Sequence, residues 1–218
     1  MGRKDEQVKW HLEILGIKQK SVIKRQGVLL TDRQFYLAGG TALALYFGHR
    51  HSVDFDWFTE QPIKDPLRLA REIQDAHRGF SVTGTDRGTL HGIMSGVRIS
   101  FIEYRYPLLS PLCHLPEYGC HLASLDDLAC MKLSAIAQRG TKKDFIDLYC
   151  LGIRHRSLLE MLNLYQEKYN IKDMTSVLYG LVYFDDAEGV RMPRMLSDIR
   201  WQDVKNTIKH WVKDVTNH

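Results

Sequence analysis

The stretch from Phe35 to Phe58, FYLAGGTALALYFGHRHSVDFDWF, carries most of the information about the fold. It begins as a short apolar run, which predicts a buried strand, and reaches a turn at Gly39-Gly40. A short helix is expected from Thr41 to about Phe47, followed by a strand over Val53–Phe58. The segment therefore predicts a strand–turn–helix–strand unit around which the rest of the chain is arranged.

Two aspartates, Asp54 and Asp56, lie on the second of these strands. Side chains alternate along a strand, so both carboxylates are expected on one face, while Val53, Phe55 and Trp57 point to the other. Two like charges on a half-buried strand repel each other unless a cation or a proton lies between them. A hard divalent cation, Mg²⁺ or Mn²⁺, is the expected occupant. A solvent-facing strand end is the alternative interpretation, because isolated Asp-x-Asp pairs are common.

The Gly39-Gly40 turn indicates an anion site next to this metal site. Glycine allows a ligand to approach the backbone closely, and the N-terminus of the following helix offers free amides to an anion. Thr41 can serve as the N-cap of that helix. Arg50, just before the strand, is either a solvated loop cation or a phosphate contact. A metal site beside an anion site indicates nucleotide phosphates.

The glycine pair, the helix and the Asp-x-Asp strand together resemble the signature of the polymerase-β-like nucleotidyltransferase superfamily. One branch of it, the AbiEii/AbiGii family, is similar at Gly39-Gly40-Thr41-Ala42-Leu43-Ala44-Leu45, Gly48-His49-Arg50, Ser52, Asp54 and Asp56. This family includes toxins of bacterial toxin–antitoxin and phage-abortive-infection systems. The resemblance implies an NTP substrate held with Mg²⁺ or Mn²⁺ on the two aspartates, which would be metal ligands and catalytic residues. Its implied nucleotide contacts near the first glycines are Gly39, Gly40, Thr41, Arg50 and Ser52.

The stretch KLSAIAQRGTKKDFIDLYCL, which starts at Lys132, resembles a second block of the same family. By that resemblance Lys132 contacts the nucleotide phosphates, and Arg139, Lys143 and Asp144 complete the pocket. Lys132 and Asp144 would then be catalytic residues, and Arg139 and Lys143 nucleotide-binding ones. Two plainer interpretations stay open. Asp144 can be the last residue of a T-x-x-D capping box, and Asp147 can pair with Lys143 one helical step away.

A third carboxylate is usual in the superfamily and is expected on a later strand. The matching run here is Val97–Tyr104, and by likeness to relatives the acidic position falls at Ser100. Serine cannot replace a metal-ligating carboxylate or act as a base. Glu103 lies on the opposite face of a regular strand, so it can substitute only through a bulge or at the strand end. The sequence therefore predicts a site with two carboxylates.

The composition is that of an ordinary globular protein. Of the 218 residues, 44% are hydrophobic and 26% charged, and the formal net charge is +4. This mild basicity fits nucleotide or RNA partners without requiring them. The four cysteines form no CxxC pair and fit no zinc template, which favours reduced thiols. With no signal-like N-terminus and no apolar run of membrane-spanning length, a soluble cytoplasmic protein is expected.

The remaining segments predict an α+β fold. After the helix–strand–helix–strand opening come a helix near Leu67–His77 and three antiparallel strands joined by turns at 86–88 and 95–96. From Ser124 onward the pattern is almost entirely helical. We expect a small mixed β-sheet nucleotidyltransferase core with flanking helices over residues 1–118. A C-terminal helical domain over residues 119–218 would complete the nucleotide pocket. Strands are expected over 35–38, 53–58, 80–85, 89–94 and 97–104, and helices over most of 5–30, 41–47, 124–140, 141–151, 157–169, 174–183 and 201–215.

These observations favour a nucleotidyltransferase that moves an NMP from an NTP to a hydroxyl group. The family resemblance implies an RNA end, such as a tRNA 3′ end, or a protein hydroxyl as acceptor. It also implies a toxin of a type IV toxin–antitoxin or phage-defence system, with a cognate antitoxin as a further partner. The alternative, favoured by Ser100, is a catalytically weakened nucleotide-binding or protein-interaction module of the same fold. A third hypothesis is a structural protein in which the Asp-x-Asp pair is accidental.

Overall fold

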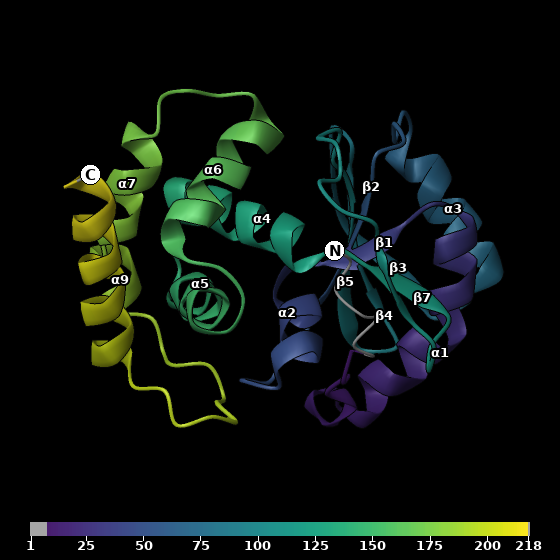
Figure 1. Cartoon of the computed structure of the whole chain (residues 1–218). Coiled ribbons are helices and arrows are strands. Elements are labelled where there is room, and N and C mark those ends of the chain that lie inside the picture. Colours follow the sequence, from purple (N-terminus) through teal and green to yellow (C-terminus); the bar gives the residue numbers. More distant parts are fainter. Residues whose placement is uncertain (1–7, 218) are drawn as a thin grey trace.

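The computed structural model describes residues 8–217 and contains a mixed β-sheet flanked by helices (Figure 1). Seven strands make up the sheet, in the order β3-β4-β5-β2-β1-β7-β6. Their bounds are β1 Tyr36–Ala38, β2 Phe55–Thr59, β3 Phe80–Asp86, β4 Thr89–Met94, β5 Val97–Glu103, β6 Cys113–Leu115 and β7 Cys120–Leu122. The predicted α+β class and the mixed sheet are confirmed. The short pair β6 and β7 was not predicted, because three-residue strands carry too little alternation to be recognised.

Parallel and antiparallel pairs meet at the centre of the sheet. Strand β2 pairs antiparallel with β1 and parallel with β5, and β1 pairs parallel with β7. The expected antiparallel strands 80–85, 89–94 and 97–104 are β3, β4 and β5, joined as hairpins. Parallel neighbours need long crossover connections, and the helices between strands provide them. The motif strand β2 therefore lies in the middle of the sheet, between β1 and β5.

Helices cover both faces of the sheet. Helices α1 Ile17–Asp32 and α3 Pro66–Ala76 pack on one face, and α2 Gly39–Phe47 packs against β1 and β2 on the other (Figure 1). The helix expected over most of 5–30 is confirmed from Ile17 onward by α1, but it is wrong for residues 8–16. That part contains only a 3₁₀ turn, η1 Leu12–Ile14, and α1 begins after Gly16. The rest of that prediction, residues 5–7, lies outside the described residues.

The C-terminal helices stand on the same side of the sheet as α2. They are α4 Leu125–Gln138, α5 Lys142–Arg154, α6 Leu158–Tyr169, α7 Thr175–Val182, the short α8 Asp185–Glu188, and α9 Trp201–Thr216. Helix α4 is central, since it contacts α2, α5, α6 and α7. Ser124 caps it by accepting a hydrogen bond from the Asp127 backbone amide at 3.0 Å, as the sequence predicted. The expected division at 118/119 falls in the turn between β6 and β7, and the helices begin at Leu125.

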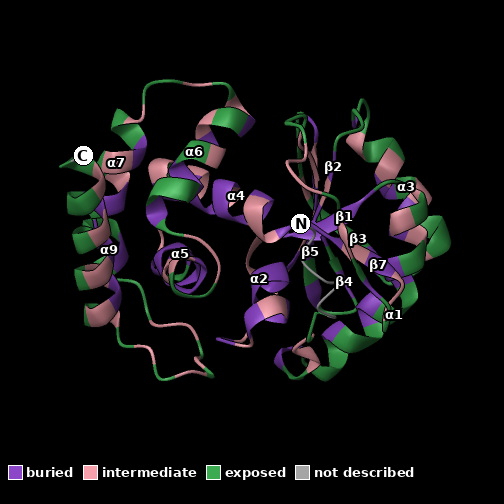
Figure 2. Ribbon diagram, viewed as in Figure 1, coloured by how far each residue is buried: buried purple, intermediate pink, exposed green. Residues whose placement is uncertain are grey.

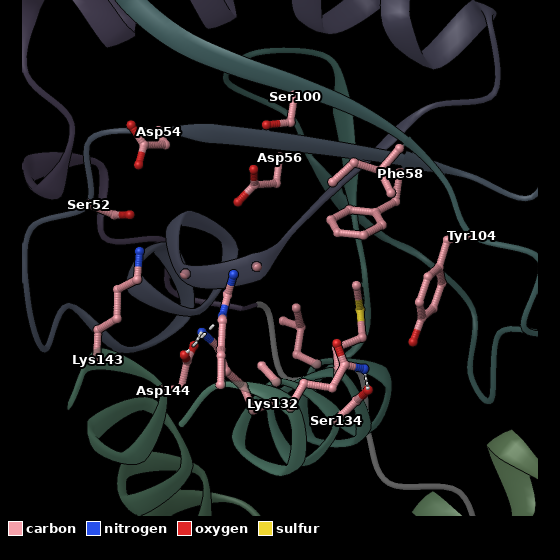
Figure 3. A pocket seen from close by; sticks show the side chains of 18 of the residues that line it. Ser52, Asp54, Asp56, Phe58, Ser100, Tyr104, Lys132, Ser134, Lys143 and Asp144 are labelled. Carbon is pink, nitrogen blue, oxygen red and sulfur yellow. Dashed lines mark hydrogen bonds and ion pairs between the residues drawn. The ribbon is translucent and has the colours of Figure 1, made fainter. Parts of the chain in front are cut away.

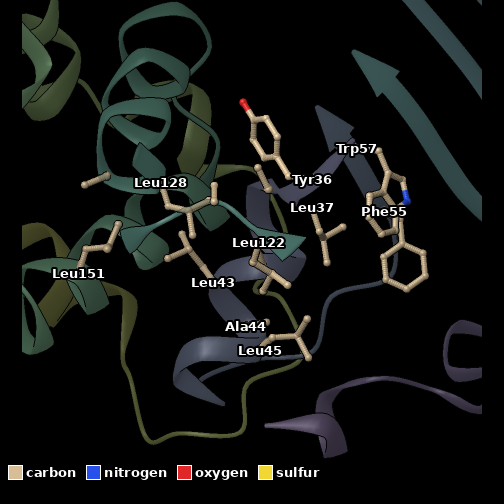
Figure 4. Close-up of a cluster of buried hydrophobic side chains, with 14 of the residues drawn as sticks. Tyr36, Leu37, Leu43, Ala44, Leu45, Phe55, Trp57, Leu122, Leu128 and Leu151 are labelled. Carbon is tan, nitrogen blue, oxygen red and sulfur yellow. The ribbon is translucent and has the colours of Figure 1, made fainter. Parts of the chain in front are cut away.

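The buried core runs without interruption from the sheet into the helices (Figure 2). Phe55 and Trp57 of β2 are almost completely buried, together with Leu37 of β1 and Leu43 of α2 (Figure 4). Burying each such side chain contributes about 1.5–3 kcal/mol. A slip of one residue in β2 would expose both aromatic rings, so their burial fixes the register of the strand and the face on which Asp56 lies. The strand expected over 53–58 begins at Phe55, and Asp54 lies just before it. Among the helices of residues 8–217, none combines the length and apolar character needed to cross a membrane.

Candidate active site

Asp54 and Asp56 line a cleft of about 460 Å³ between the sheet and helices α4 and α5 (Figure 3). We call the side formed by β2, β4 and β5 the sheet wall, and the side formed by α4 and α5 the helix wall. The cleft is lined by Gly39, Gly40, Arg50, Ser52, Asp54, Asp56, Phe58, His91, Ser100, Ile102, Tyr104, Leu128, Met131, Lys132, Ser134, Ala135, Gln138, Arg139, Lys143 and Asp144. The fold thus brings every sequence-predicted site residue except Thr41 to one cleft, and Thr41 lies directly behind it.

Strand register sets one row of side chains along the sheet wall. Asp56 lies opposite Ala38 of β1 on one side and opposite Ser100 of β5 on the other. Ser100 in turn lies opposite His91 of β4. The position that the family resemblance gives to a third carboxylate, Ser100, therefore lies directly beside Asp56. The pairing of β2 with β5 is continuous, without a bulge.

Glu103 does not enter the cleft. Its carboxylate accepts a hydrogen bond from the Ile63 backbone amide at 2.7 Å and pairs with Arg105. Glu103 lies opposite Thr59, and strand alternation points the side chains of these two residues to the other face of the sheet from Asp56 and Ser100. It therefore pins the loop after β2, and the hypothesis that a bulge turns it into a third ligand is wrong. The sheet wall has two carboxylates, and among the described residues no three His, Cys, Asp or Glu side chains are grouped to hold a metal.

The two aspartates have different partners. Arg98 donates to both oxygens of Asp54, with Nε 2.7 Å from Oδ1 and Nη2 3.2 Å from Oδ2. Asp56 has no ion-pair partner among the described residues. Burial raises the pKa of Asp56, and the neighbouring Asp54 charge raises it further, while the Ser100 hydroxyl and Lys132 act in the opposite direction. Burial, more than the neighbouring Asp54, therefore makes the ionised form of Asp56 unfavourable.

Backbone conformation and close contact require the two glycines at the start of α2. Gly39 has φ +68°, which side-chain-bearing residues rarely adopt, and a Cβ there would lie 2.9 Å from Asp56 Oδ2. A Cβ on Gly40 would lie 2.4 Å from an Nη atom of Arg50. The glycines therefore let both charged side chains approach the backbone. Helix α2 starts at Gly39, so its free N-terminal amides lie beside Asp56.

Thr41 is not the N-cap of α2, because Ala38 occupies that position and Thr41 lies inside the helix. Its hydroxyl instead hydrogen-bonds the Ser52 hydroxyl at 2.8 Å and the Asp54 backbone carbonyl. Thr41 therefore fixes the entry of the chain into β2. This contact holds Ser52 and Asp54 at the polar end of the cleft.

A buried ionic cluster joins the helix wall to the loop after α2. Arg50 donates to both oxygens of Asp147 at 2.7 Å, and Lys132 Nζ lies 2.7 Å from Asp147 and 2.9 Å from Asp144. His49 Nε2 also lies 2.8 Å from Asp147. All five side chains are buried. Arg50 is therefore no solvated loop cation, and the suggested pairing of Asp147 with Lys143 is wrong.

The charges of this cluster balance one another. Burial alone would raise the pKa of Asp147, but Arg50 and Lys132 hold it well below its usual range. Burial lowers the pKa of His49 despite the neighbouring Asp147, so His49 stays neutral at neutral pH. Two cations, Arg50 and Lys132, thus face two carboxylates, Asp144 and Asp147. Burying these charges together costs less free energy than burying any one of them without its partner.

Asp144 belongs to this cluster rather than to a helix cap. Thr141 makes no side-chain cap to the α5 backbone, and its hydroxyl donates to Asp144 at 2.5 Å. Arg139 Nε lies 3.5 Å from the same carboxylate. Lys132 is the main positive charge that keeps the pKa of Asp144 low against its burial. The capping-box interpretation is therefore wrong, and Asp144 positions the Lys132 ammonium group at the cleft.

Two cations of the helix wall remain exposed. Lys143 extends toward Ser52 and Asp54 (Figure 3) and has no ion-pair partner among the described residues. Arg139 touches Asp144 only at 3.5 Å, and 64% of its side chain is exposed. Both side chains can bind an anion in the cleft without breaking a short ion pair to a buried carboxylate. Of the predicted phosphate contacts, Lys143 and Arg139 are thus more accessible than Arg50 and Lys132.

The opposite end of the cleft is apolar. Phe58 and Tyr104 meet edge to face with ring centroids 5.5 Å apart, and Met131 of α4 lies across from them. Gln138 donates to Ser134 at 3.1 Å on the same helix wall. This part of the site was not predicted. The signal was the continued alternation after Asp54 and Asp56, which places residue 58 on their face.

A segment near the C-terminus braces the site. Arg50 forms an isolated antiparallel bridge with Met195, the His51 amide donates to the Arg194 carbonyl at 2.8 Å, and the Leu196 amide donates to the His49 carbonyl at 2.9 Å. The loop that carries Arg50 is therefore held from both sides.

Comparisons with known proteins agree with this geometry. The profile of a family described as "Nucleotidyl transferase AbiEii toxin, Type IV TA system" matches residues 29–108. A protein of Aquifex aeolicus (strain VF5) called "Uncharacterized protein aq_aa25" is 39% identical over 202 residues, covering 90% of this chain and 95% of that one.

Solved structures share the fold. MenT4, a nucleotidyltransferase toxin from Mycobacterium tuberculosis H37Rv, has a TM-score of 0.59 at 17% identity, covering 89% of this chain and 82% of that chain. JHP933 from Helicobacter pylori has a TM-score of 0.54 at 14% identity, covering 94% and 93%. The family match spans the strand–helix–strand unit that carries the two aspartates, and the relatives extend over nearly the whole length. The chain therefore belongs to the AbiEii nucleotidyltransferase toxin family.

Proposed function

We propose that this protein transfers an NMP group from an NTP to an acceptor hydroxyl with the help of Mg²⁺ or Mn²⁺. The observation that carries the proposal is the contrast across the cleft. Of the two aspartates on the sheet wall only Asp54 has an ion-pair partner among the described residues, and the helix wall presents Lys143 and Arg139 to the same space. A metal bound to triphosphate would satisfy the aspartates, and the phosphates would satisfy the cations.

The aspartate pair fits a hard divalent ion. Mg²⁺ is usually held by one or two carboxylates plus substrate phosphates rather than by a closed protein cage. Asp54 and Asp56 supply two carboxylates on one face, and Asp56 is the less compensated of the two. The ion would neutralise charge on the phosphates during transfer. Arg98 has to release Asp54 before both oxygens of that carboxylate become available.

The residues of the cleft divide the remaining tasks. The amides at Gly39 and Gly40, with Ser52, lie where they can hold phosphate oxygens, and Lys143 and Arg139 supply opposing charge. Lys132 adds positive charge from within its buried cluster. The apolar end between Phe58 and Met131 suits a flat nucleobase. In this arrangement an acceptor oxygen attacks the α-phosphate in line and pyrophosphate leaves.

For the acceptor we favour an RNA end, such as a tRNA 3′ end, over a protein hydroxyl. The net charge of +4 suits a polyanion, and the description of the matched family, a toxin of a type IV toxin–antitoxin system, supports the same choice. A cognate antitoxin and a role in phage defence follow from that membership as part of the proposal. The helical part, from about residue 119, would complete the nucleotide pocket, because α4 and α5 line one side of the cleft.

The second candidate function is nucleotide binding without turnover. Ser100 favours it, because it occupies the row position expected for a third carboxylate. The two candidates predict the same Mg²⁺-dependent nucleotide affinity and differ only in product formation.

The test is incubation with each labelled NTP, Mg²⁺ and total RNA, with calorimetric measurement of nucleotide affinity alongside. We expect labelled RNA from the wild type and none from Asp54→Asn or Asp56→Asn. The matched control is Asp203→Asn, a change on the distant helix α9 that should leave labelling intact. Unchanged nucleotide affinity in the Asp54→Asn/Asp56→Asn double variant would contradict the metal site. Intact affinity without labelling of RNA or protein by the wild type would establish the binding module instead.

A further inference from the structure

The row across the sheet wall ends in a histidine. His91 Nδ1 lies 3.1 Å from the Ser100 hydroxyl oxygen, and Ser100 lies between His91 and Asp56 in the strand register. His91 is exposed and lines the cleft, and it makes no ion pair among the described residues. Nothing in the sequence motif singled it out, because it comes from β4, outside both motif blocks.

The hydroxyl of Ser100 can set which ring nitrogen of His91 carries the proton. The Ser100 hydroxyl has one proton, and the strand register places it between Asp56 and His91. If that proton points to Asp56, the serine oxygen has only lone pairs to offer to His91. The neutral imidazole then carries its proton on Nδ1 and an open lone pair on Nε2. Ser100 thus orients His91 instead of acting itself.

The other titratable side chains of the cleft are poorly suited to accept a proton. Asp144 is bound to Lys132, while Lys132 and Arg50 hold their protons firmly among buried aspartates. Burial raises the pKa of Tyr104, so it stays a neutral phenol. The pair Asp54 and Asp56 is committed to the metal in the proposed function. The groups that can modulate His91 are Asp56 and Arg98 on the same face of the sheet, Asp86 on β3, which lies opposite Thr89, and Arg139 and Lys143 on the helix wall.

We propose that His91 is the general base that takes the proton of the acceptor hydroxyl, in place of a third carboxylate. This inference rests on the proposed nucleotidyl transfer. His91 Nε2 removes the proton while the acceptor oxygen forms its bond to the α-phosphorus. The bond from that phosphorus to the bridging oxygen breaks, and pyrophosphate leaves with the electron pair. The imidazolium then returns its proton to water.

The experiment compares His91→Ala and His91→Gln with the wild type, using labelled NTP, Mg²⁺ and the total RNA that accepts label. General-base catalysis contributes about 10²–10⁴-fold, so we expect single-turnover transfer to fall by about that factor in both variants. The dissociation constant of Mg·NTP should stay within about twofold, because His91 touches neither the metal ligands nor the phosphates. The matched control is His114→Ala, an exposed histidine on the edge strand β6 outside the cleft.

Rescue of transfer by added imidazole distinguishes a general base from a residue with only a structural role. It should restore transfer in His91→Ala, where the removed ring leaves space, and should not restore it in Asp56→Asn. Transfer within about threefold of the wild type in His91→Ala, or a loss that imidazole does not rescue, would overturn the assignment. In that case the transferase itself would stand. If the wild type labels no RNA or protein with any NTP, the proposed function fails, and the role of His91 fails with it.

Discussion

The two walls of the cleft each carry two aspartates, and they treat them in opposite ways. On the helix wall, Asp144 and Asp147 are completely buried, yet nearby cations hold both pKa values below the usual range. On the sheet wall, Asp56 is less buried but its pKa is raised, and only Asp54 has an ion-pair partner. Burial alone therefore does not set the state of a carboxylate here. The number of cations within reach of it does.

This difference separates a structural role from a binding role. The helix wall has enough internal charge to neutralise its own aspartates, so it needs no ligand to be stable. The sheet wall is left with an excess of negative charge, which an external cation can relieve. Within one cleft, the compensated pair holds the architecture, and Asp56 has no ion-pair partner among the described residues, which agrees with the metal-binding role that we propose for it.

The largest expected effect is on the compensated wall. Asp147→Asn removes the negative charge shared by Arg50 and Lys132 and leaves both cations buried, with only Asp144 to face them. Breaking a buried pair in this way costs about 3–5 kcal/mol, and we expect that loss in the free energy of unfolding. Urea denaturation measures it. The control Asp203→Asn removes an exposed pair with Arg200 and should change stability by less than about 1 kcal/mol.

Acid should also lower the free energy of unfolding of the wild type, because it protonates Asp147. The folded-state pKa of Asp147 lies below its unfolded value, so its stabilisation is present above about pH 4 and is lost as the pH falls through the folded pKa. Asp147→Asn should therefore lose less stability than the wild type in strong acid. A loss under about 1 kcal/mol at neutral pH would show that the helix wall is not held by this cluster.

The second largest effect is expected for Asp56→Asn on the sheet wall, where we expect a loss of binding and no loss of stability. Because the fold raises the pKa of Asp56, its ionised carboxylate is unfavourable in the folded state, and Asp56→Asn should leave the metal-free protein equally stable or more stable. The same change should weaken Mg·NTP binding at least tenfold, about 1.4 kcal/mol. Thermal melts in EDTA and with Mg·NTP measure both. A variant that melts well below the wild type in EDTA would mean that Asp56 is structural.

The smallest effect concerns the one ion pair on the sheet wall. Arg98→Gln removes the side chain that holds Asp54, and 71% of the Arg98 side chain is exposed. Exposed pairs contribute about 0.2–1 kcal/mol, so stability should change little. Freed from Arg98, Asp54 should bind Mg²⁺ more readily, and the Mg²⁺ concentration needed for nucleotide binding should fall by about two- to fivefold. A higher Mg²⁺ requirement would instead make Arg98 a phosphate contact.

The sequence predicted the sheet wall better than the helix wall. Alternation along β2 and β5 was enough to put Asp56 and Ser100 on one face, since strand geometry is local once the register is fixed. Asp54 lines the same cleft from the position just before β2. The same alternation could have found Phe58 and Arg98. On the helix wall, the family resemblance marked Lys132 and Asp144. The local contacts considered for Asp144 and Asp147 are absent, and both carboxylates pair with Lys132 instead.

By itself, then, the sequence determined the strand–turn–helix–strand unit, the shared face of the two aspartates and the family. Each depends on residues within a few positions of one another, where spacing fixes geometry. The tertiary structure decided which charges are compensated. Arg50 and Asp147 meet across 97 positions, and His91 reaches the site only because β4 pairs with β5. Charge balance depends on distance in space and on burial, and neither can be read from spacing along the chain.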